Sequence, residues 1–181
     1  PWDYDINNPE FENDRATYEL LASGKTNGVF QVESAGMKDL LIRLKPKLEQ
    51  LDFEVISVIL ALYRPDSMGA LDEYVEMATG GSRPPSIHPD MDEILKDTNY
   101  CMIYQEQLLD IVKKFGGRTY GGADLFRKAI GKKIVELVQK ESEILRGEIV
   151  ANGYSKEIAD KIADELASKG GYLFNKSHSF S

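Results

Sequence analysis

Apolar residues recur every three or four positions along most of the chain, which is the spacing of one face of an α-helix. Ile158, Ile162 and Leu166 follow this spacing strictly, and the segment from Leu108 to Phe115 is amphipathic. The pattern predicts helices over about residues 14–23, 34–45, 69–79, 89–95, 108–115, 123–130, 132–151 and 155–169.

Polar residues mark the starts of several of these helices. Asn13 or Asp14, Ser34 and Ser155 each precede an apolar periodic segment, and such side chains accept a hydrogen bond from a first-turn N–H group. His88-Pro89 has the form of a cap followed by a first-turn proline. The helix boundaries are therefore expected to follow local capping chemistry.

Three segments are also compatible with extended structure. Residues 28–32 and 100–104 show short extended patterns, and residues 55–60 are rich in β-branched side chains. Residues 50–62 are apolar on most sides, so they would form either a central helix or a buried strand. We predict a mainly α fold with one or two short β pieces. The tail, 172–181, is polar and aromatic, which a frayed terminus would also show.

The composition is that of an ordinary globular domain. The 181 residues are 42% hydrophobic and 29% charged, enough for a single core. One cysteine, Cys101, excludes an internal disulfide, and only two histidines argue against a zinc cluster. No long apolar run and no basic, apolar N-terminus are present, so we expect a cytoplasmic protein without a membrane partner. The absence of an initiator Met suggests an excised piece.

The charge is distributed unevenly along the chain. The net charge is −8, and residues 1–90 carry all of it, with 16 acidic and 8 basic residues. Residues 113–133 instead contain seven basic residues and one acid, Asp124. A concentrated basic window in an acidic chain predicts a local anion site rather than a general nucleic-acid surface.

Within this window, the segment GGADLFRKAIGKK (121–133) places cations on a glycine-flanked helix. Lys128 and Lys132 lie four residues apart, and Gly131 follows Arg127 by four, so nothing blocks access beside that guanidinium. Arg and Lys together suit the oxygens of a polyphosphate. The alternative is a solvated basic face in which Asp124 pairs with Lys128.

Other chemistry-bearing residues have simpler explanations. Arg64 emerges from a buried element as a carboxylate partner or a site residue, and Glu106 suits a helix first turn. Asp3 and Asp5 form a D-x-D at a terminus, where a metal role is disfavoured. Cys101 lies in an apolar run typical of a core residue. No G-x-x-x-x-G-K-[ST] loop occurs, which argues against a P-loop nucleotide hydrolase.

Several segments together resemble one family, the α subunit of bacterial DNA polymerase III, the C-family replicative polymerase. The similar segments are GVFQVESAGM (28–37), ALYRP (61–65), HP (88–89) with IYQEQ (103–107), ADLFRKAIGKK (123–133) and FNKSHS (174–179). Their order and length make the resemblance specific. It places residues 1–13 just after an absent palm domain and residues 14–181 in a fingers domain that is truncated at its C-terminus.

The resemblance implies roles that spacing alone does not. It implies triphosphate contacts for Arg127, Lys128, Lys132 and Lys133, and a place near the cleft for Arg64, Gln105, Asn175, Lys176, Ser177 and His178. In the family, palm aspartates upstream of this segment hold two Mg²⁺ ions. We therefore expect no catalytic or metal-binding residue here and an inactive chain, from a parent enzyme that is a DNA-directed DNA polymerase, a nucleotidyltransferase.

The implied partners are the incoming deoxynucleoside triphosphate (dNTP), primer–template DNA and other replisome subunits. The sequence departs from the family pattern at Asp66-Ser67, where the family has Gly-Pro, and at Lys128, where it has a second Arg. These departures suit a diverged paralogue or a phage enzyme. Two alternatives stay open: a non-catalytic helical interaction protein that retains the scaffold, and a DNA-binding module that uses residues 113–133.

Overall fold

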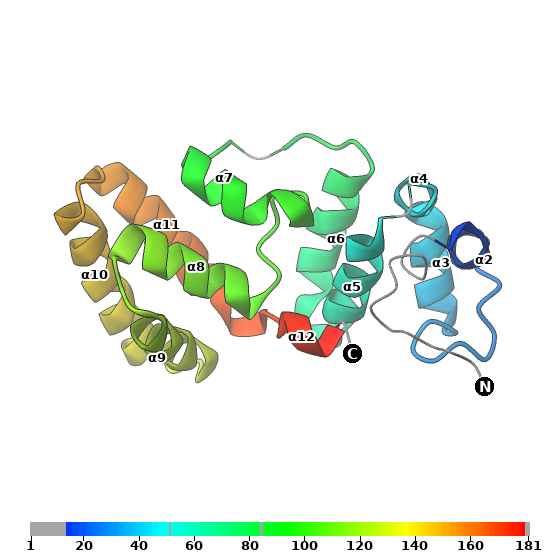
Figure 1. The fold of residues 1–181 in the computed structure, drawn as a ribbon. Helices are drawn as coiled ribbons and strands as arrows, with labels where there is room; N and C mark the ends of the chain where they lie inside the picture. The colour runs from blue at the N-terminus through cyan, green and yellow to red at the C-terminus, as the bar shows by residue number, and fades with distance from the viewer. Residues whose placement is uncertain (1–13, 51, 84, 180–181) are drawn as a thin grey trace, which may run out of the picture.

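The computed structural model describes residues 14–50, 52–83 and 85–179, which fold into helices joined by turns and loops (Figure 1). The α-helices are α2 (Arg15–Ala22), α3 (Ala35–Arg43), α4 (Lys45–Leu48), α5 (Phe53–Leu62), α6 (Met68–Ala78), α7 (Pro89–Leu95), α8 (Gln105–Gly116), α9 (Tyr120–Gly131), α10 (Val135–Ala151), α11 (Lys156–Lys169) and α12 (Lys176–Ser179). Single 3₁₀ turns lie at Pro65–Ser67, Lys96–Thr98 and Gly170–Tyr172.

Local capping chemistry fixes the starts of α2, α3 and α11, as predicted. The carboxylate of Asp14 accepts from the backbone N–H of Ala16 and Thr17, and Ser34 Oγ accepts from Met37 N at 3.3 Å. Ser155 Oγ accepts from Ile158 N at 3.2 Å. These bonds satisfy N–H groups that have no partner within the helix.

Of the predicted β structure, the described residues contain a single isolated β-bridge. Residues 53–62 form α5, so the strand alternative for 55–60 is wrong, and residues 28–32 form turns. Within the described ranges, Tyr104 and Phe174 form an isolated parallel bridge, and no sheet is present. A helix tolerates the β-branched residues of α5 because Val55, Val58 and the neighbouring Ile59 are surrounded by other helices.

Two helix boundaries near the basic window differ from the prediction. Thr119 caps α9 by accepting from Gly122 N at 3.3 Å, so Gly121 and Gly122 lie inside the first turn rather than before it. Lys133 has a left-handed backbone, with φ of 55°. That conformation breaks the path of the helix, and α10 begins at Val135 instead of residue 132.

The helices enclose two hydrophobic clusters. The first joins α2–α6 with Cys101, Ile103 and Tyr104, and the second joins α7–α11. Figure 1 shows α2–α4 at one end of the molecule, α9–α11 at the other, and α5, α6 and α12 between them. Burial raises the pKa of the Cys101 thiol to about 12, which agrees with a core role.

The tail is anchored, so its interpretation as a frayed end is wrong for residues 172–179. Phe174 N donates to Ile103 O at 2.9 Å, and Gln105 N donates to Phe174 O at 2.8 Å. The hydroxyls of Ser179 and Ser57 lie 2.7 Å apart. The tail thus closes over the junction between the two clusters. Among the described residues, none of the helices combines the length and apolarity needed to cross a membrane.

Candidate functional site

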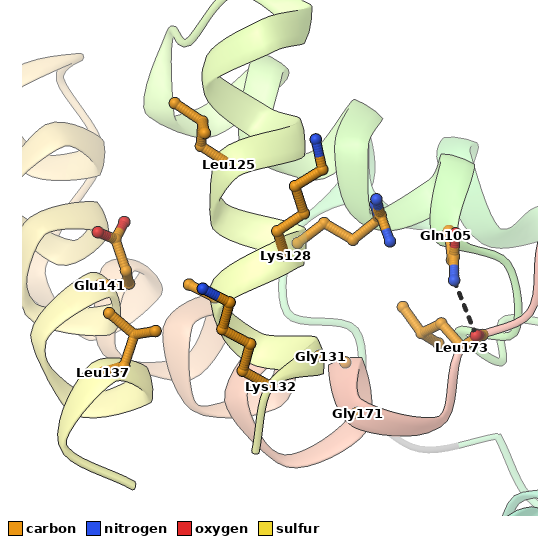
Figure 2. A pocket seen from close by; sticks show the side chains of 12 residues that line it. Gln105, Leu125, Lys128, Gly131, Lys132, Leu137, Glu141, Gly171 and Leu173 are labelled. Atoms are coloured by element: carbon orange, nitrogen blue, oxygen red, sulfur yellow. Dashed lines mark hydrogen bonds between the residues drawn. The ribbon is translucent and has the colours of Figure 1, made fainter. Parts of the chain in front are cut away.

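A cleft of about 760 Å³ opens beside the C-terminal half of α9. Arg127, Lys128 and Lys132 line it, and Leu125 and Gly131 come from the same helix. Figure 2 shows Lys128 on α9 and Lys132 just after its end, with Leu137 and Glu141 of α10 on one side and Gln105 and Leu173 on the other. The structure therefore brings three of the four predicted triphosphate contacts into one cleft.

The carboxylate of Asp124 pairs with two of the cations in the cleft, Arg127 and Lys128. Asp124 Oδ1 accepts from Arg127 Nε and lies 2.8 Å from its NH2 group, while Asp124 Oδ2 lies 2.8 Å from Lys128 Nζ. Lys128 and Arg127, in that order of effect, lower the pKa of Asp124. The Asp124–Lys128 pair predicted from spacing is confirmed. Together with Lys132, these four side chains carry a net charge of +2; Glu141, which also lines the cleft, pairs with Arg118.

Gly131 keeps the cleft open between these cations. A Cβ atom built on Gly131 would meet no atom within 4 Å, so an incoming group can approach the backbone there. Gly170 and Gly171, in the 3₁₀ turn after α11, also line the cleft. The site is thus an open basic cleft that is lined in part by glycines.

Lys133 lies apart from the other three cations. It is not among the described residues that line the cleft, and it lines a separate hollow of about 360 Å³ with Asp66 and Tyr172. Lys133 Nζ lies 3.8 Å from Asp66 Oδ2, and both side chains are largely exposed. A pair of this kind contributes little stability.

Among the predicted neighbours, Gln105 reaches the cleft and Arg64 does not. Gln105 Nε2 donates to Leu173 O at 3.3 Å at the cleft edge (Figure 2). Arg64 donates from Nε to Ala61 O at 2.8 Å and from NH2 to Tyr172 O at 2.9 Å. Its guanidinium lies 4.7 Å from the centre of the Phe174 ring, in a second hollow. Its described partners are carbonyls and a ring, and not a carboxylate, which was one of the two roles that the sequence left open.

The polar tail also lies outside the basic cleft. Asn175 Oδ1 accepts from His178 N at 3.2 Å and from the hydroxyl of Ser177, which closes the turn of α12. Lys176 Nζ lies 3.1 Å from Glu54 Oε2. His178 lines the same second hollow as Arg64.

Sequence reasoning missed the part that Glu106 plays in holding this tail. Both of its carboxylate oxygens accept from the backbone N–H of Lys176, at 3.2 and 3.1 Å. A first-turn carboxylate has a sufficient local explanation in the helix dipole. Its long-range partner, 70 residues away, leaves no periodic signal in the sequence.

Replacing Glu106 with alanine is expected to destabilise the chain by about 1 kcal/mol, because a charged acceptor is removed from a partly buried N–H group. Glu106→Gln keeps one acceptor oxygen and should lose less. Urea unfolding gives the free energy, and hydrogen exchange at the Lys176 amide reports the local loss. Glu136→Ala, which removes the first-turn acid of α10, is the matched control. Equal losses in both alanine variants would contradict a specific anchor.

Metal-binding residues are not gathered at this cleft. In the ranges that the structure describes, no group of three or more His, Cys, Asp or Glu side chains could hold a metal ion. Asp3 and Asp5 lie outside the described residues. The lining of the cleft includes three cationic side chains, those of Arg127, Lys128 and Lys132.

The described residues thus form an all-helical domain with a basic cleft between α9 and its neighbours. The chain matches the finger domain of the bacterial DNA polymerase III alpha subunit over residues 3–170, and it belongs to that family.

Curated relatives named DNA polymerase III subunit alpha show the same likeness. The protein from Halalkalibacterium halodurans is 40% identical over 166 residues, and that from Aquifex aeolicus is 40% identical over 170 residues; each alignment covers 92% of this chain and 14% of the relative. The Rickettsia conorii protein is 40% identical over 177 residues, covering 98% and 15%. The chain thus spans about one seventh of these relatives.

Proposed function

We propose that this chain is the fingers part of a DNA-directed DNA polymerase of the polymerase III alpha type, and that Arg127, Lys128 and Lys132 bind the triphosphate of the incoming dNTP. The observation that carries the proposal is the convergence of these three side chains in one cleft, beside a glycine that leaves the approach open. Lys133, which faces another hollow, has no part in it.

The chemistry of the cleft suits a triphosphate. A guanidinium can donate two parallel hydrogen bonds to phosphate oxygens, and an ammonium adds a mobile point charge. Cations that face the departing pyrophosphate stabilise the negative charge that develops there in the transition state. Such residues affect the rate as well as binding, because the charge on the leaving group grows during the reaction.

The catalytic part of the reaction is assigned to the parent protein. The family resemblance puts the aspartates that hold two Mg²⁺ ions in the palm, so we propose that this chain alone is inactive. Primer–template DNA and other replisome subunits are the proposed partners, and the cytoplasm is the proposed location. The alternative, a non-catalytic helical interaction protein that retains the scaffold, is supported by Asp124. This residue pairs with both Arg127 and Lys128 and offsets part of their positive charge.

The test is a titration of the chain with a dNTP, followed by NMR. We expect shifts at Arg127, Lys128 and Lys132 at millimolar ligand, and weaker binding at higher salt because the contacts are ionic. No shift in this segment would favour the scaffold alternative. Gel shifts with duplex DNA at low salt test the DNA-binding alternative, for which tight binding through residues 113–133 is required.

A further inference from the structure

Two Asn-Gly pairs occur in the chain, Asn27-Gly28 and Asn152-Gly153. Such a pair can modify itself, because the backbone nitrogen of the glycine can attack the side-chain carbonyl carbon of the asparagine and close a succinimide ring. Glycine favours the attack, since it has no Cβ atom to crowd the nitrogen, and reactions of this kind make asparagine a thermolabile residue. The surroundings of each pair therefore decide how fast it reacts.

The Asn27-Gly28 pair lies exposed in the turn that precedes α3. A Cβ atom at Gly28 would meet no atom within 4 Å, so water can reach the pair. Gly28 N donates to Glu33 Oε2 at 3.1 Å. The nitrogen that must lose a proton thus faces a carboxylate, and a carboxylate within hydrogen-bond reach can act as a general base.

The carbonyl oxygen of the Asn27 side chain also has a partner that favours the reaction. Lys38 Nζ, from α3, donates to Asn27 Oδ1. Negative charge develops on this oxygen when the glycine nitrogen adds to the neighbouring carbon, and a cationic donor aimed at the oxygen stabilises that charge. A base and a cationic donor are therefore placed on the two reacting groups of one pair.

The second pair has the same two residues in different surroundings. Gly153 N donates to Val150 O at 3.0 Å, and a neutral backbone carbonyl is a poor acceptor for a proton. Asn152 Nδ2 donates to Phe115 O at 2.8 Å, which ties the side-chain amide to the end of α8. The nitrogen that would have to leave as ammonia is thus held by a neighbouring helix.

We propose that Asn27 is a site of spontaneous deamidation that the fold promotes, with Glu33 as the base and Lys38 as the cationic donor. The nitrogen of Gly28 forms a bond to Asn27 Cγ while its proton passes to Glu33. The bond from Cγ to the side-chain nitrogen then breaks, and ammonia leaves with the proton that Glu33 returns. Water opens the ring at either carbonyl, which gives aspartate or isoaspartate; the whole sequence consumes one water and releases one ammonia.

The modification would change a turn that is otherwise firmly held. The hydroxyl of Thr26 donates to the carbonyl of Val32, and both residues are buried. Between them lies Phe30, whose exposed fraction of 85% is the highest among the large hydrophobic residues described as exposed. Isoaspartate adds a methylene group to the main chain, so it should move Phe30, and either product places a negative charge beside Lys38. The proposal does not depend on the proposed function.

The experiment follows both pairs in one sample of the full 181-residue chain, kept at neutral pH and analysed over time by peptide mass spectrometry. We expect Asn27 to be lost about tenfold faster than Asn152, because only Asn27 has a general base and a cationic donor in place. In urea, where neither pair keeps its partners, the two rates should become nearly equal. An isoaspartate-specific assay identifies the product.

Variants separate the two groups. Glu33→Gln keeps an acceptor for the glycine N–H but cannot take its proton, and Lys38→Met keeps the stem without the charge; each should slow the loss of Asn27 about fivefold. Lys38→Arg should retain most of the rate, because the positive charge remains. Glu49→Gln, which removes an exposed carboxylate from another turn, is the matched control and should change nothing.

The proposal would be overturned by equal loss of Asn27 and Asn152 in the folded chain, or by faster loss of Asn27 in urea than in the folded chain. It would also be overturned by unchanged rates in both Glu33→Gln and Lys38→Met. A rate in Lys38→Arg as slow as in Lys38→Met would remove Lys38 from the mechanism. Urea unfolding of each variant shows that a slower rate does not come from a changed fold.

Discussion

Replacing Arg127 with alanine is expected to weaken dNTP binding by this chain about tenfold or more, since the charge-assisted bidentate contact is lost. Arg127 contributes the only guanidinium among the residues that line the described basic cleft. Arg127→Lys should retain part of the affinity, because the lysine ammonium keeps the positive charge but cannot donate two parallel hydrogen bonds as a guanidinium does. Isothermal calorimetry at low salt measures the change.

Two further variants test whether the loss of affinity is specific to the cleft. Lys133→Ala removes a cation one residue beyond Lys132 but outside the cleft, so it should leave the affinity nearly unchanged. Asp124→Asn should tighten binding, because it removes the acid that holds Arg127 and Lys128. Equal losses in Arg127→Ala and Lys133→Ala would show that diffuse charge, rather than the cleft, binds the triphosphate.

Replacing Gly170 with alanine is expected to destabilise the chain by about 2 kcal/mol, the cost of overpacking a full core. A Cβ atom at Gly170 would lie 2.7 Å from Ile130 Cγ2 and 3.2 Å from Leu108 Cδ1. Ile130 lies in α9, the helix that carries the cations, so the clash should also move the cleft wall. Urea unfolding gives the free energy, and the dNTP titration reports the effect on the site.

The neighbouring glycine is the control for this change. A Cβ atom at Gly171 would meet only the Lys133 side chain, with Cε at 3.6 Å and Cγ at 3.9 Å, which is ordinary contact. Gly171→Ala should therefore change the free energy of unfolding by less than half as much. Adding Ile130→Ala to Gly170→Ala should cost less than the sum of the two single changes, because it removes the clashing methyl group. Additive losses would contradict a direct clash.

The arrangement of the cations supports the triphosphate hypothesis in one respect, the shared cleft, and adds a competing ion pair with Asp124. Arg127 and Lys128 lie in the same cleft, as the hypothesis requires. Both also pair with Asp124, which the spacing anticipated for Lys128 alone. A triphosphate must therefore compete with one carboxylate for both cations, and this competition makes the Asp124 variant informative.

Several features of this protein follow from short stretches of sequence. The caps at Asp14, Ser34 and Ser155 act within three residues, so the helix starts can be read locally. The pairing of Asp124 with Lys128 follows from helical spacing. The family resemblance depends on local motifs in order along the chain, and the match over residues 3–170 confirms it. The division at residue 13 stays a prediction, since residues 1–13 lie outside the described part.

Other features depend on contacts between distant residues. Periodicity could not choose between helix and strand for residues 55–60, because both bury the same side chains. The separation of Lys133 from Lys132 depends on one left-handed residue, and the anchoring of the tail depends on Glu106 and Ser57.

The sequence by itself determined where most of the helices lie and where positive charge is concentrated, because propensity, capping and spacing act over a few residues. Only the tertiary structure decided which cations share a cleft, how the tail is held and where Phe30 is presented, because these depend on packing between segments far apart in the chain.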